Sequence, residues 1–301
     1  MRRSFAVLLA LLIWASLSML SSRQATAADE LIPFITPPAG GGAYIVGAGM
    51  ISVSNKYIAQ PKFVHEAATG TMDIVRRMMA REAAKKGVFG IFGTVDAWNA
   101  YKGNNEYKGR PFTGLRMVVF VMGTDLYLVV PSNSPIKSYG DDGVAKKDYK
   151  PYYYTYKETV EGIQNGSLDG GFIAGGYPIA AYNELAVQKA VRIVPVDEGK
   201  VKKIVAEHPY YYRTTVKAKS YKGLEQDTTI MGFTTGLWTH AGLSDDIVYK
   251  FLKNLFDHRN DYYAIHSTAK ELTPQSALNG LSVPLHPGAE KYFREVGILK
   301  K

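Results

Sequence analysis

The residues of this chain that could do chemistry are glycines and small polar residues at three points where a predicted strand leads into a predicted helix. At such a corner the first backbone N–H groups of the helix have no partner, and the helix dipole is positive there. A corner of this kind suits a carboxylate or a phosphate group. The residues that we single out are Gly41, Gly42 and Tyr44 at the first corner, Thr69, Gly70 and Thr71 at the second, and Gly175, Gly176, Tyr177 and Pro178 at the third.

A second interpretation of these corners needs no ligand. A tight turn between a strand and a helix explains the three glycines at residues 40–42 equally well, and an ordinary helix cap explains residues 69–71. Nucleotide binding is disfavoured, because the first corner lacks the Gly-x-Gly-x-x-Gly pattern and no Gly-x-x-x-x-Gly-Lys-Ser/Thr sequence follows it.

Catalytic sets are missing from the sequence. Residues 166–170 read Gly-Ser-Leu-Asp-Gly and do not match the Gly-x-Ser-x-Gly elbow of hydrolases. The six histidines form no His-Glu-x-x-His motif and no pair with ligand spacing, and His286 is interpreted as a packed or capping residue. There are no cysteines. We therefore predict a binding protein and not an enzyme, with no catalytic residue, no metal site and no cofactor.

The elements that must position the corners alternate between strands and helices, which predicts an α/β architecture with largely parallel sheets. Ligands of such sheets bind at the carboxyl ends of strands, where all three corners lie. The predicted strands are 31–35, 63–67, 88–92, 115–122, 125–130, 168–174, 191–196 and 228–238, with a strand end at 151–154. Helices are predicted at 44–57, 72–86, 94–98 and 198–207, after capping boxes at Thr155/Glu158 and Thr268/Glu271, and from Pro178, Ser244 and Pro287. Residues 99–114, 210–212 and 216–221 are predicted to be irregular.

The N-terminus has the pattern of an export signal. Arg2 and Arg3 precede an apolar run at residues 5–20, and Ala25-Thr26-Ala27 offers small residues for cleavage after Ala27. The apolar run is short for a membrane span, which favours a cleaved signal peptide at 1–27 over an anchor. We expect an exported, periplasmic protein of bacterial type.

The charge of the chain is mildly basic. Loss of the signal peptide removes three arginines from a formal net charge of +9 and leaves +6. No run of basic residues is longer than two, so the pattern gives no sign of nucleic-acid binding. Without cysteines the protein has no disulfides, so its stability must come from a hydrophobic core.

The C-terminal sequence resembles a known family. Residues 283–299, Val-Pro-Leu-His-Pro-Gly-Ala-Glu-Lys-Tyr-Phe-Arg-Glu-Val-Gly-Ile-Leu, are similar to the ending of TAXI-type solute receptors of TRAP transporters. Residues 126–130, 134–137, 166–178 and 221–223 support the resemblance, which covers nearly the whole mature chain.

This resemblance implies a two-lobed fold like that of type II periplasmic binding proteins, with a ligand cleft between the lobes. We expect lobe one at 28–130 and 230–301, lobe two at 131–229, and a separate sheet in each. The implied partners are a small carboxylate or amino-acid-like ligand and an inner-membrane TRAP permease driven by an ion gradient, with the receptor itself a monomer. By position, the implied ligand wall combines the first two corners, Tyr127 and residues 175–178.

Two departures from the family pattern matter. Residues 37–39, Pro-Pro-Ala, stand where such receptors carry Gly and Thr, and Pro33 falls inside the first strand. After Asp141 a whole strand–corner–helix unit is predicted to be missing, so lobe two is expected to be shortened and less stable. The sequence leaves three alternatives open: a module that presents ligand to a membrane sensor, a shortened homologue that no longer binds, and a secreted hydrolase, which lacks any catalytic set.

Overall fold

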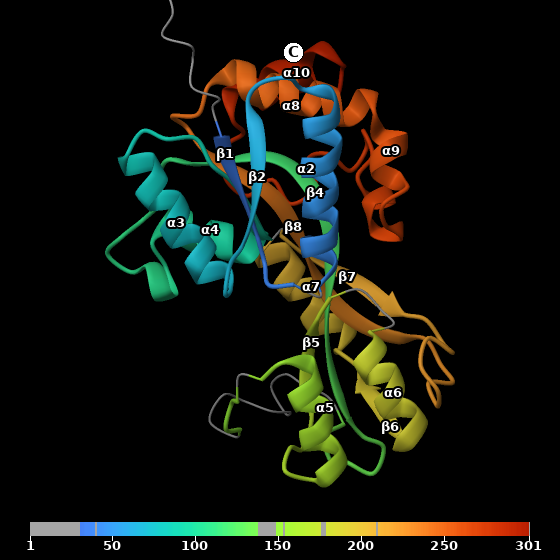
Figure 1. Ribbon diagram of the computed structural model, residues 1–301. Helices are drawn as coiled ribbons and strands as arrows, with labels where there is room; N and C mark the ends of the chain where they lie inside the picture. Colours follow the sequence, from blue (N-terminus) through green and yellow to red (C-terminus); the bar gives the residue numbers. More distant parts are fainter. Residues whose placement is uncertain are drawn as a thin grey trace, which may run out of the picture.

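The computed structural model describes residues 31–39, 41–137, 149–152, 154–175, 179–208 and 210–300. The predicted signal peptide, its cleavage after Ala27, residues 176–178 and the predicted deletion after Asp141 lie outside these ranges. In Figure 1 the described chain forms an upper and a lower body that are joined by two long strands. Eight strands form one sheet in the order β2-β1-β3-β8-β4-β5, with β6 paired to β4 and β7 paired to β8.

The upper body, which we call lobe one, is built on three parallel strands. These are β1 (Leu31–Thr36), β2 (Lys62–Ala67) and β3 (Phe89–Gly93). Helix α2 (Gly42–Tyr57) lies close on one face, because Gly47 leaves room for the side chains of Thr36 and Ile91. Helix α3 (Thr71–Ala83) lies on the other face, where Gly90 leaves room for Ile74 and Met78. The remaining elements are α4 (Thr94–Lys102), η1 (Asn105–Tyr107), α8 (Asp245–Asp257), α9 (Arg259–Tyr263), η3 (Ser267–Glu271) and α10 (Pro287–Glu295).

Two long antiparallel strands run through both bodies. β4 (Leu115–Pro131) has 17 residues and β8 (Thr228–His240) has 13, and they pair from Leu115 opposite His240 to Leu126 opposite Met231. The register shifts twice, between Met117 and Val119 and between Phe120 and Met122, as at β-bulges. Residues 115–122 and 125–130 are therefore one strand and not the two adjacent strands that we predicted, because Gly123 and Thr124 continue the pairing with β8.

The lower body, which we call lobe two, consists of short elements around the far ends of β4 and β8. They are α5 (Tyr156–Asn165), β5 (Gly171–Ala174), α6 (Ala180–Gln188), β6 (Val191–Val194), α7 (Glu198–Glu207) and β7 (Tyr211–Val216). β5 and β6 both run antiparallel to β4, and β7 runs antiparallel to β8. The predicted capping box that opens α5 is confirmed, since Thr155 and Glu158 satisfy each other's backbone N–H groups.

The two lobes have separate hydrophobic cores although they share a sheet. Among the described residues, 43 buried hydrophobic side chains form the lobe-one cluster, including a group of contacting rings from Phe34, Phe63, Phe89 and Phe251. The main cluster of lobe two has 13, among them Tyr127 from β4. The predicted two-lobed α/β fold is confirmed.

The sheet differs from the prediction in two respects. Only the β1–β2 and β1–β3 pairs are parallel among the described strands, so the expectation of largely parallel sheets is wrong outside lobe one. Phe92 in β3 and Phe172 in β5 belong to the same sheet, so the lobes do not have separate sheets. Both differences follow from the length of β4 and β8, which pair with strands of both lobes.

Several local predictions are corrected as well. Residues 151, 152 and 154 are not in a strand. Residues 211–216 form β7 because β8 offers them an edge, so the prediction of irregular structure is wrong for residues 211, 212 and 216. Helix α4 continues to Lys102 and ends at Gly103, which has a positive φ of 70°. Residues 267–271 form a 3₁₀ helix capped by the side chain of His266 in place of the predicted box. His286 is confirmed as a buried cap, with its Nδ1 accepting from the N–H of Gly288.

The unequal cores make a testable prediction about stability. Lobe two buries fewer apolar side chains, and its strands β5 and β6 have four residues each. Local opening costs less free energy where fewer apolar contacts are lost. We expect amide hydrogens of residues 171–174 and 191–194 to exchange faster than those of residues 89–93, as measured by hydrogen-exchange mass spectrometry. Equal protection in the two lobes would contradict this prediction.

Candidate functional site

The first two predicted corners lie side by side at the carboxyl edge of the sheet. β1 and β2 are parallel neighbours whose last residues pair, so the turns that follow them leave the same edge. α2 begins at Gly42 with Gly41 as its N-cap, and α3 begins at Thr71 with Gly70 as its N-cap. The structure therefore brings residues 41–44 and 69–71 together.

The two helix starts differ in how their positive ends are satisfied. At α3 the carboxylate of Asp73 accepts the N–H of Thr69 at 3.3 Å, and the guanidinium groups of Arg76 and Arg77 hold its pKa at about 2. At α2 there is no acidic residue in the first turn and no side chain caps the helix. A methyl group added at Gly41 would meet no atom within 4 Å. The start of α2 is therefore the corner with room and unneutralised dipole for an anionic ligand.

A small polar group lies under the start of α2. The hydroxyl of Thr36, the last residue of β1, lies 2.8 Å from Nε2 of His65 on β2. The ring of Tyr44 packs on the His65 ring with 4.7 Å between centroids. Burial lowers the pKa of His65, so its imidazole is neutral near pH 7. Tyr44 was predicted as a site residue, and His65 fixes the position of its ring.

The third corner begins next to the crossing strands. The N–H of Gly175, which follows β5, donates to the carbonyl oxygen of Asp125 on β4 at 2.9 Å. Tyr127, a predicted wall residue, is fully buried, and its hydroxyl lies 2.7 Å from the hydroxyl of Tyr221. The Tyr221 hydroxyl in turn accepts the N–H of Ile179. Tyr127 thus supports the chain around the third corner from beneath, and Gly176, Tyr177 and Pro178 lie outside the described residues.

Tyr212 occupies the point where β4 and β8 pass from one lobe to the other. A methyl group added at Gly232 of β8 would lie 2.5 Å from Cζ of the Tyr212 ring. A methyl group added at Gly123 of β4 would lie 2.4 Å from the Tyr212 hydroxyl. Both distances are shorter than any real contact, so the ring is seated where both crossing strands lack a side chain.

Two carboxylates from different elements meet Tyr212 at this crossing. The Tyr212 hydroxyl donates to Oδ1 of Asp125 at 3.3 Å, and the backbone N–H of Gly123 donates to Oε2 of Glu271 at 2.7 Å. Partial burial raises the pKa of Asp125, whereas the hydrogen bond from Tyr212 acts to lower it. Partial burial also raises the pKa of Glu271, and the nearby Asp125 charge adds to this. Each carboxylate would therefore gain from a cation placed between them.

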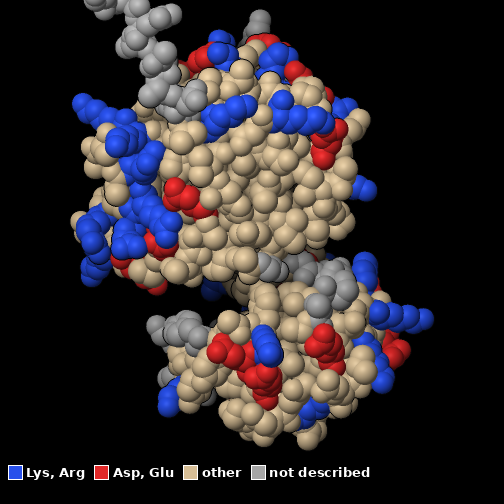
Figure 2. All heavy atoms as spheres, in the orientation of Figure 1, with Lys and Arg blue, Asp and Glu red and all other residues tan. Residues whose placement is uncertain are grey.

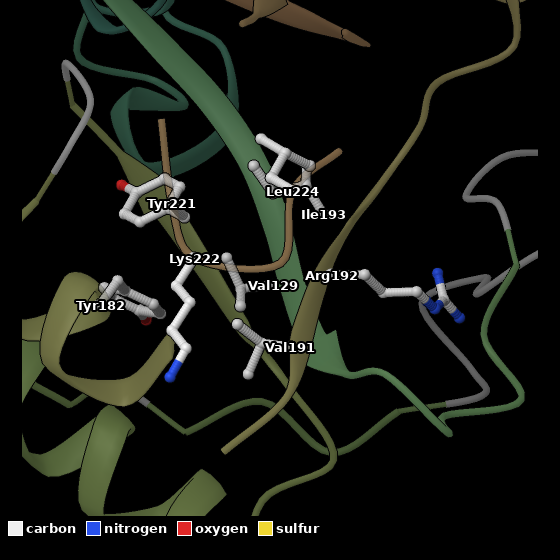
Figure 3. Close-up of a pocket in the computed structure, with 8 residues that line it drawn as sticks. All are labelled: Val129, Tyr182, Val191, Arg192, Ile193, Tyr221, Lys222 and Leu224. Atoms are coloured by element: carbon white, nitrogen blue, oxygen red, sulfur yellow. The ribbon is translucent and has the colours of Figure 1, made fainter. Parts of the chain in front are cut away.

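The cavity drawn in Figure 3 lies elsewhere, in lobe two. Its volume of about 10 Å³ is room for one water molecule. The hydroxyl of Tyr221 points away from it in Figure 3, and the wall is mostly apolar. We therefore place the candidate site at the junction of the lobes and not in this cavity. The lining residues are Val129, Tyr182, Val191, Arg192, Ile193, Tyr221, Lys222 and Leu224.

Two lobes around a shared pair of strands, with helix starts and polar groups at the junction, define the class of two-lobed periplasmic binding proteins. The chain belongs to the NMT1-like family, whose sequence profile matches residues 34–142 and 139–297.

Solved structures that are similar to this chain include proteins named as solute-binding proteins. MatC from Rhodopseudomonas palustris, solved with bound malate, superposes with a TM-score of 0.50 at 13% identity over 88% of this chain and 97% of that chain. A TctC solute-binding protein from Polaromonas gives 0.45 at 13% identity over 91% and 100% of the two chains. The aliphatic sulphonate-binding protein SsuA from Escherichia coli gives 0.38 at 13% identity over 88% and 78%. At such identities the likeness to MatC establishes the fold alone.

Two further findings concern the described part of the chain. None of its helices has the length and apolar character needed to cross a membrane. Within the same residues, no three His, Asp or Glu side chains gather closely enough to hold a metal ion.

Four residues of the candidate site escaped sequence reasoning: His65, Asp125, Tyr212 and Glu271. No ligand-binding motif surrounds any of them in the sequence, and contacts between distant elements bring the last three together. One signal was present, because an isolated glycine inside a strand often marks a close approach by another group. Gly123 and Gly232 are such glycines, and Tyr212 is the group that approaches.

The seat of Tyr212 can be tested with a double-mutant cycle. Gly232→Ala places a methyl group against the ring, and overpacking of this kind costs about 1–3 kcal/mol. In a Tyr212→Ala background the ring is absent, so we expect the same substitution to cost much less. Urea unfolding of the four proteins measures the coupling. If the effects of the two substitutions on stability are additive, the added methyl group clashes with a group other than Tyr212.

Asp96, in the first turn of α4, predicts a pH dependence. Burial, with the charge of Glu106 adding to it, raises the pKa of Asp96 to about 6 from an ordinary value of 3.8. The folded protein therefore resists ionisation, so this residue lowers the free energy of unfolding as the pH rises from about 4 to about 6. We expect the stability of Asp96→Asn relative to the unsubstituted protein to rise by about 3 kcal/mol across that range, measured by denaturant titration. A difference that does not change with pH would contradict the prediction.

Proposed function

We propose that this protein is a solute receptor that binds a small ligand at the junction of its lobes and delivers it to a membrane transporter. The observation that carries the proposal, in a chain of the NMT1-like family, is that the open start of α2 lies beside the polar groups around Tyr212. A Cβ added at Gly42 of α2 would lie 3.3 Å from Cε of Met122, the residue before Gly123. Helix α2 belongs to lobe one, and β7, which carries Tyr212, belongs to lobe two. A ligand bound between them would therefore hold the lobes together.

The ligand class that fits these groups is a zwitterion such as an amino acid. A carboxylate is favoured at the start of α2, where the helix dipole is not neutralised and Gly41 borders open space. An ammonium group is favoured beside Asp125 and Glu271, because burial and mutual repulsion destabilise their negative charges. Within the described residues, the junction groups that we find are carboxylates, hydroxyls and an imidazole, which favours a ligand with both charges over a dicarboxylate.

The transport partner in this proposal is a TRAP permease of the inner membrane, and the receptor is of the TAXI type. The support is the sequence of residues 283–299, which resembles the ending of such receptors. In the structure residues 287–295 form α10, opened by His286 and Pro287. The receptor would act in the periplasm after removal of residues 1–27.

The lobe boundaries are also part of the proposal. We assign residues 28–130 with 230–301 to lobe one and 131–229 to lobe two. The buried clusters support crossings slightly inside these limits, because Tyr127 and Val129 pack in lobe two whereas Met122 packs in lobe one. Movement of the lobes would then turn on Gly123 and Gly232. The predicted loss of a unit from lobe two stays a prediction.

Ligand class is tested by calorimetric titration with a panel of amino acids and with malate. Native mass spectrometry of the freshly purified protein first shows whether a small molecule co-purifies. We expect at least one amino acid to bind and malate to bind at least tenfold more weakly. If dicarboxylates bind and no amino acid does, the zwitterion assignment is wrong. If neither native mass spectrometry nor titration detects any ligand, the receptor proposal itself fails.

Substitutions at each end of the site refine the test. Gly42→Val crowds the start of α2, where an added Cβ would lie 3.3 Å from Cε of Met122, and should weaken binding. Asp125→Asn removes a charge while keeping the shape of the side chain, and should weaken an amino acid more than its analogue without the amino group. Lys253→Ala on exposed α8 is the matched control and should leave affinity unchanged. If the three substitutions change ligand affinity equally, the ligand does not bind at the junction of the lobes.

A further inference from the structure

One segment of lobe one carries a large net positive charge. Residues 71–116 carry nine lysines and arginines against four acidic residues, a net charge of +5. The mature chain as a whole carries +6. Figure 2 shows blue side chains gathered at the left edge of the upper body, where Figure 1 places α3 and the segment after α4.

The four acidic residues of this segment offset only part of its charge. Asp73 is held in ion pairs by Arg76 and Arg77, at 2.6 and 2.7 Å. Glu82 and Asp96 are half-buried, and Glu106 is exposed. Five cations remain exposed, and none of them forms an ion pair with a carboxylate of the described chain. They are Lys85, Lys86, Lys102, Lys108 and Arg110, which we call the basic face.

Contacts between distant residues bring the two halves of the basic face together. The carboxylate of Glu82 on α3 lies against Gly114 in the segment before β4. The carbonyl of Lys86 lies 3.0 Å from Nε2 of His240, and the N–H of Ala241 donates to the carbonyl of Gly114. The end of α3 and the residues before β4 therefore lie close together, because both contact the turn that follows β8.

Lys85 stands in a conformation that favours glycine. Its φ is 54°, and the N–H of Lys86 closes the end of α3 by donating to the carbonyl of Arg81. Helices commonly end this way with a glycine at the left-handed position, because a side chain there is strained. The backbone at Lys85 is therefore strained, and the lysine side chain adds an exposed charge to the basic face.

We propose that the basic face docks on an anionic phospholipid bilayer. The exposed large hydrophobic side chain of residues 71–116 is Met72, which lies at the start of α3, whereas Lys85 and Lys86 follow its end. Specific protein interfaces are built around a buried apolar centre, which this face lacks. Lipid headgroups need no such centre, since a row of lysines near an anionic surface is attracted by its potential alone. Attachment through lobe one would leave lobe two free to move on the crossing strands.

Vesicle sedimentation tests the proposal with the mature protein. The probes are vesicles of pure phosphatidylcholine and vesicles with about a third phosphatidylglycerol. We expect binding to the second kind only, and its loss as salt rises from about 0.05 to about 0.5 M, because screening shortens the reach of the charges. No binding to anionic vesicles at low salt, or equal binding to both kinds, overturns the proposal. Binding to an acidic protein partner without binding to vesicles would assign the face to a protein.

Two sets of variants separate the face from the net charge. Lys85→Glu with Lys86→Glu and Lys108→Glu should lower vesicle binding at least about tenfold. The matched control, Lys157→Glu with Lys202→Glu and Lys203→Glu, changes the net charge equally on exposed helices of lobe two and should have little effect. Equal losses in the two sets would show that net charge alone drives binding and would overturn the proposal.

A single substitution then separates charge from stability. Lys85→Gly relieves the strained backbone, so we expect a higher thermal midpoint together with weaker vesicle binding. Unchanged vesicle binding by this variant and by the triple variant would overturn the proposal even if the midpoint rises.

Discussion

The pairing of β4 with β8 is the constraint on which the rest of the structure depends. The two strands leave the lobe-one core together and enter the lobe-two core together, and they stay hydrogen-bonded from Leu115 opposite His240 to Leu126 opposite Met231. A pair of bonded strands can twist, but it cannot fold back on itself as a single loop could. The lobes are therefore held in a limited range of orientations, and every strand added by either lobe pairs with this central ribbon or extends from it.

The side chains along the ribbon show how it passes from one core to the other. Hydroxyls replace apolar side chains there: Thr124 and Thr235 share a hydrogen bond of 2.7 Å across the two strands, and Thr94 bonds both backbone and side chain of Thr234. Buried hydroxyls cost free energy unless they are paired, and these are paired with one another. The crossing is thus dry enough to strengthen electrostatic interactions and polar enough to accept a charged group.

The structure of lobe one could be predicted from the sequence more accurately than that of lobe two. Strands 63–67 and 88–92 and the helix starts at residues 42 and 71 could be read locally, because glycine caps and helical periodicity act within a few residues. β7 could not, since Tyr211–Val216 becomes a strand only through the edge that β8 offers. The same limit applied to the site: the corner glycines follow from local rules, whereas Asp125, Tyr212 and Glu271 meet through long-range pairing that no local pattern encodes.

The charges at the crossing connect the proposed ligand to the movement of the lobes. Asp125 lies on the crossing strand, Tyr212 on a strand of lobe two and Glu271 in lobe one, and each lies within bonding distance of a neighbour around Gly123. Burial raises the pKa of both carboxyl groups, and the charge of Asp125 raises the pKa of Glu271 further, so two negative charges at this place are unfavourable without a cation. An ammonium group bound between them would replace repulsion by attraction from both sides. Because Tyr212, the hydrogen-bond partner of Asp125, belongs to lobe two and Glu271 belongs to lobe one, the bonds that hold such a ligand would also favour one lobe orientation over the others.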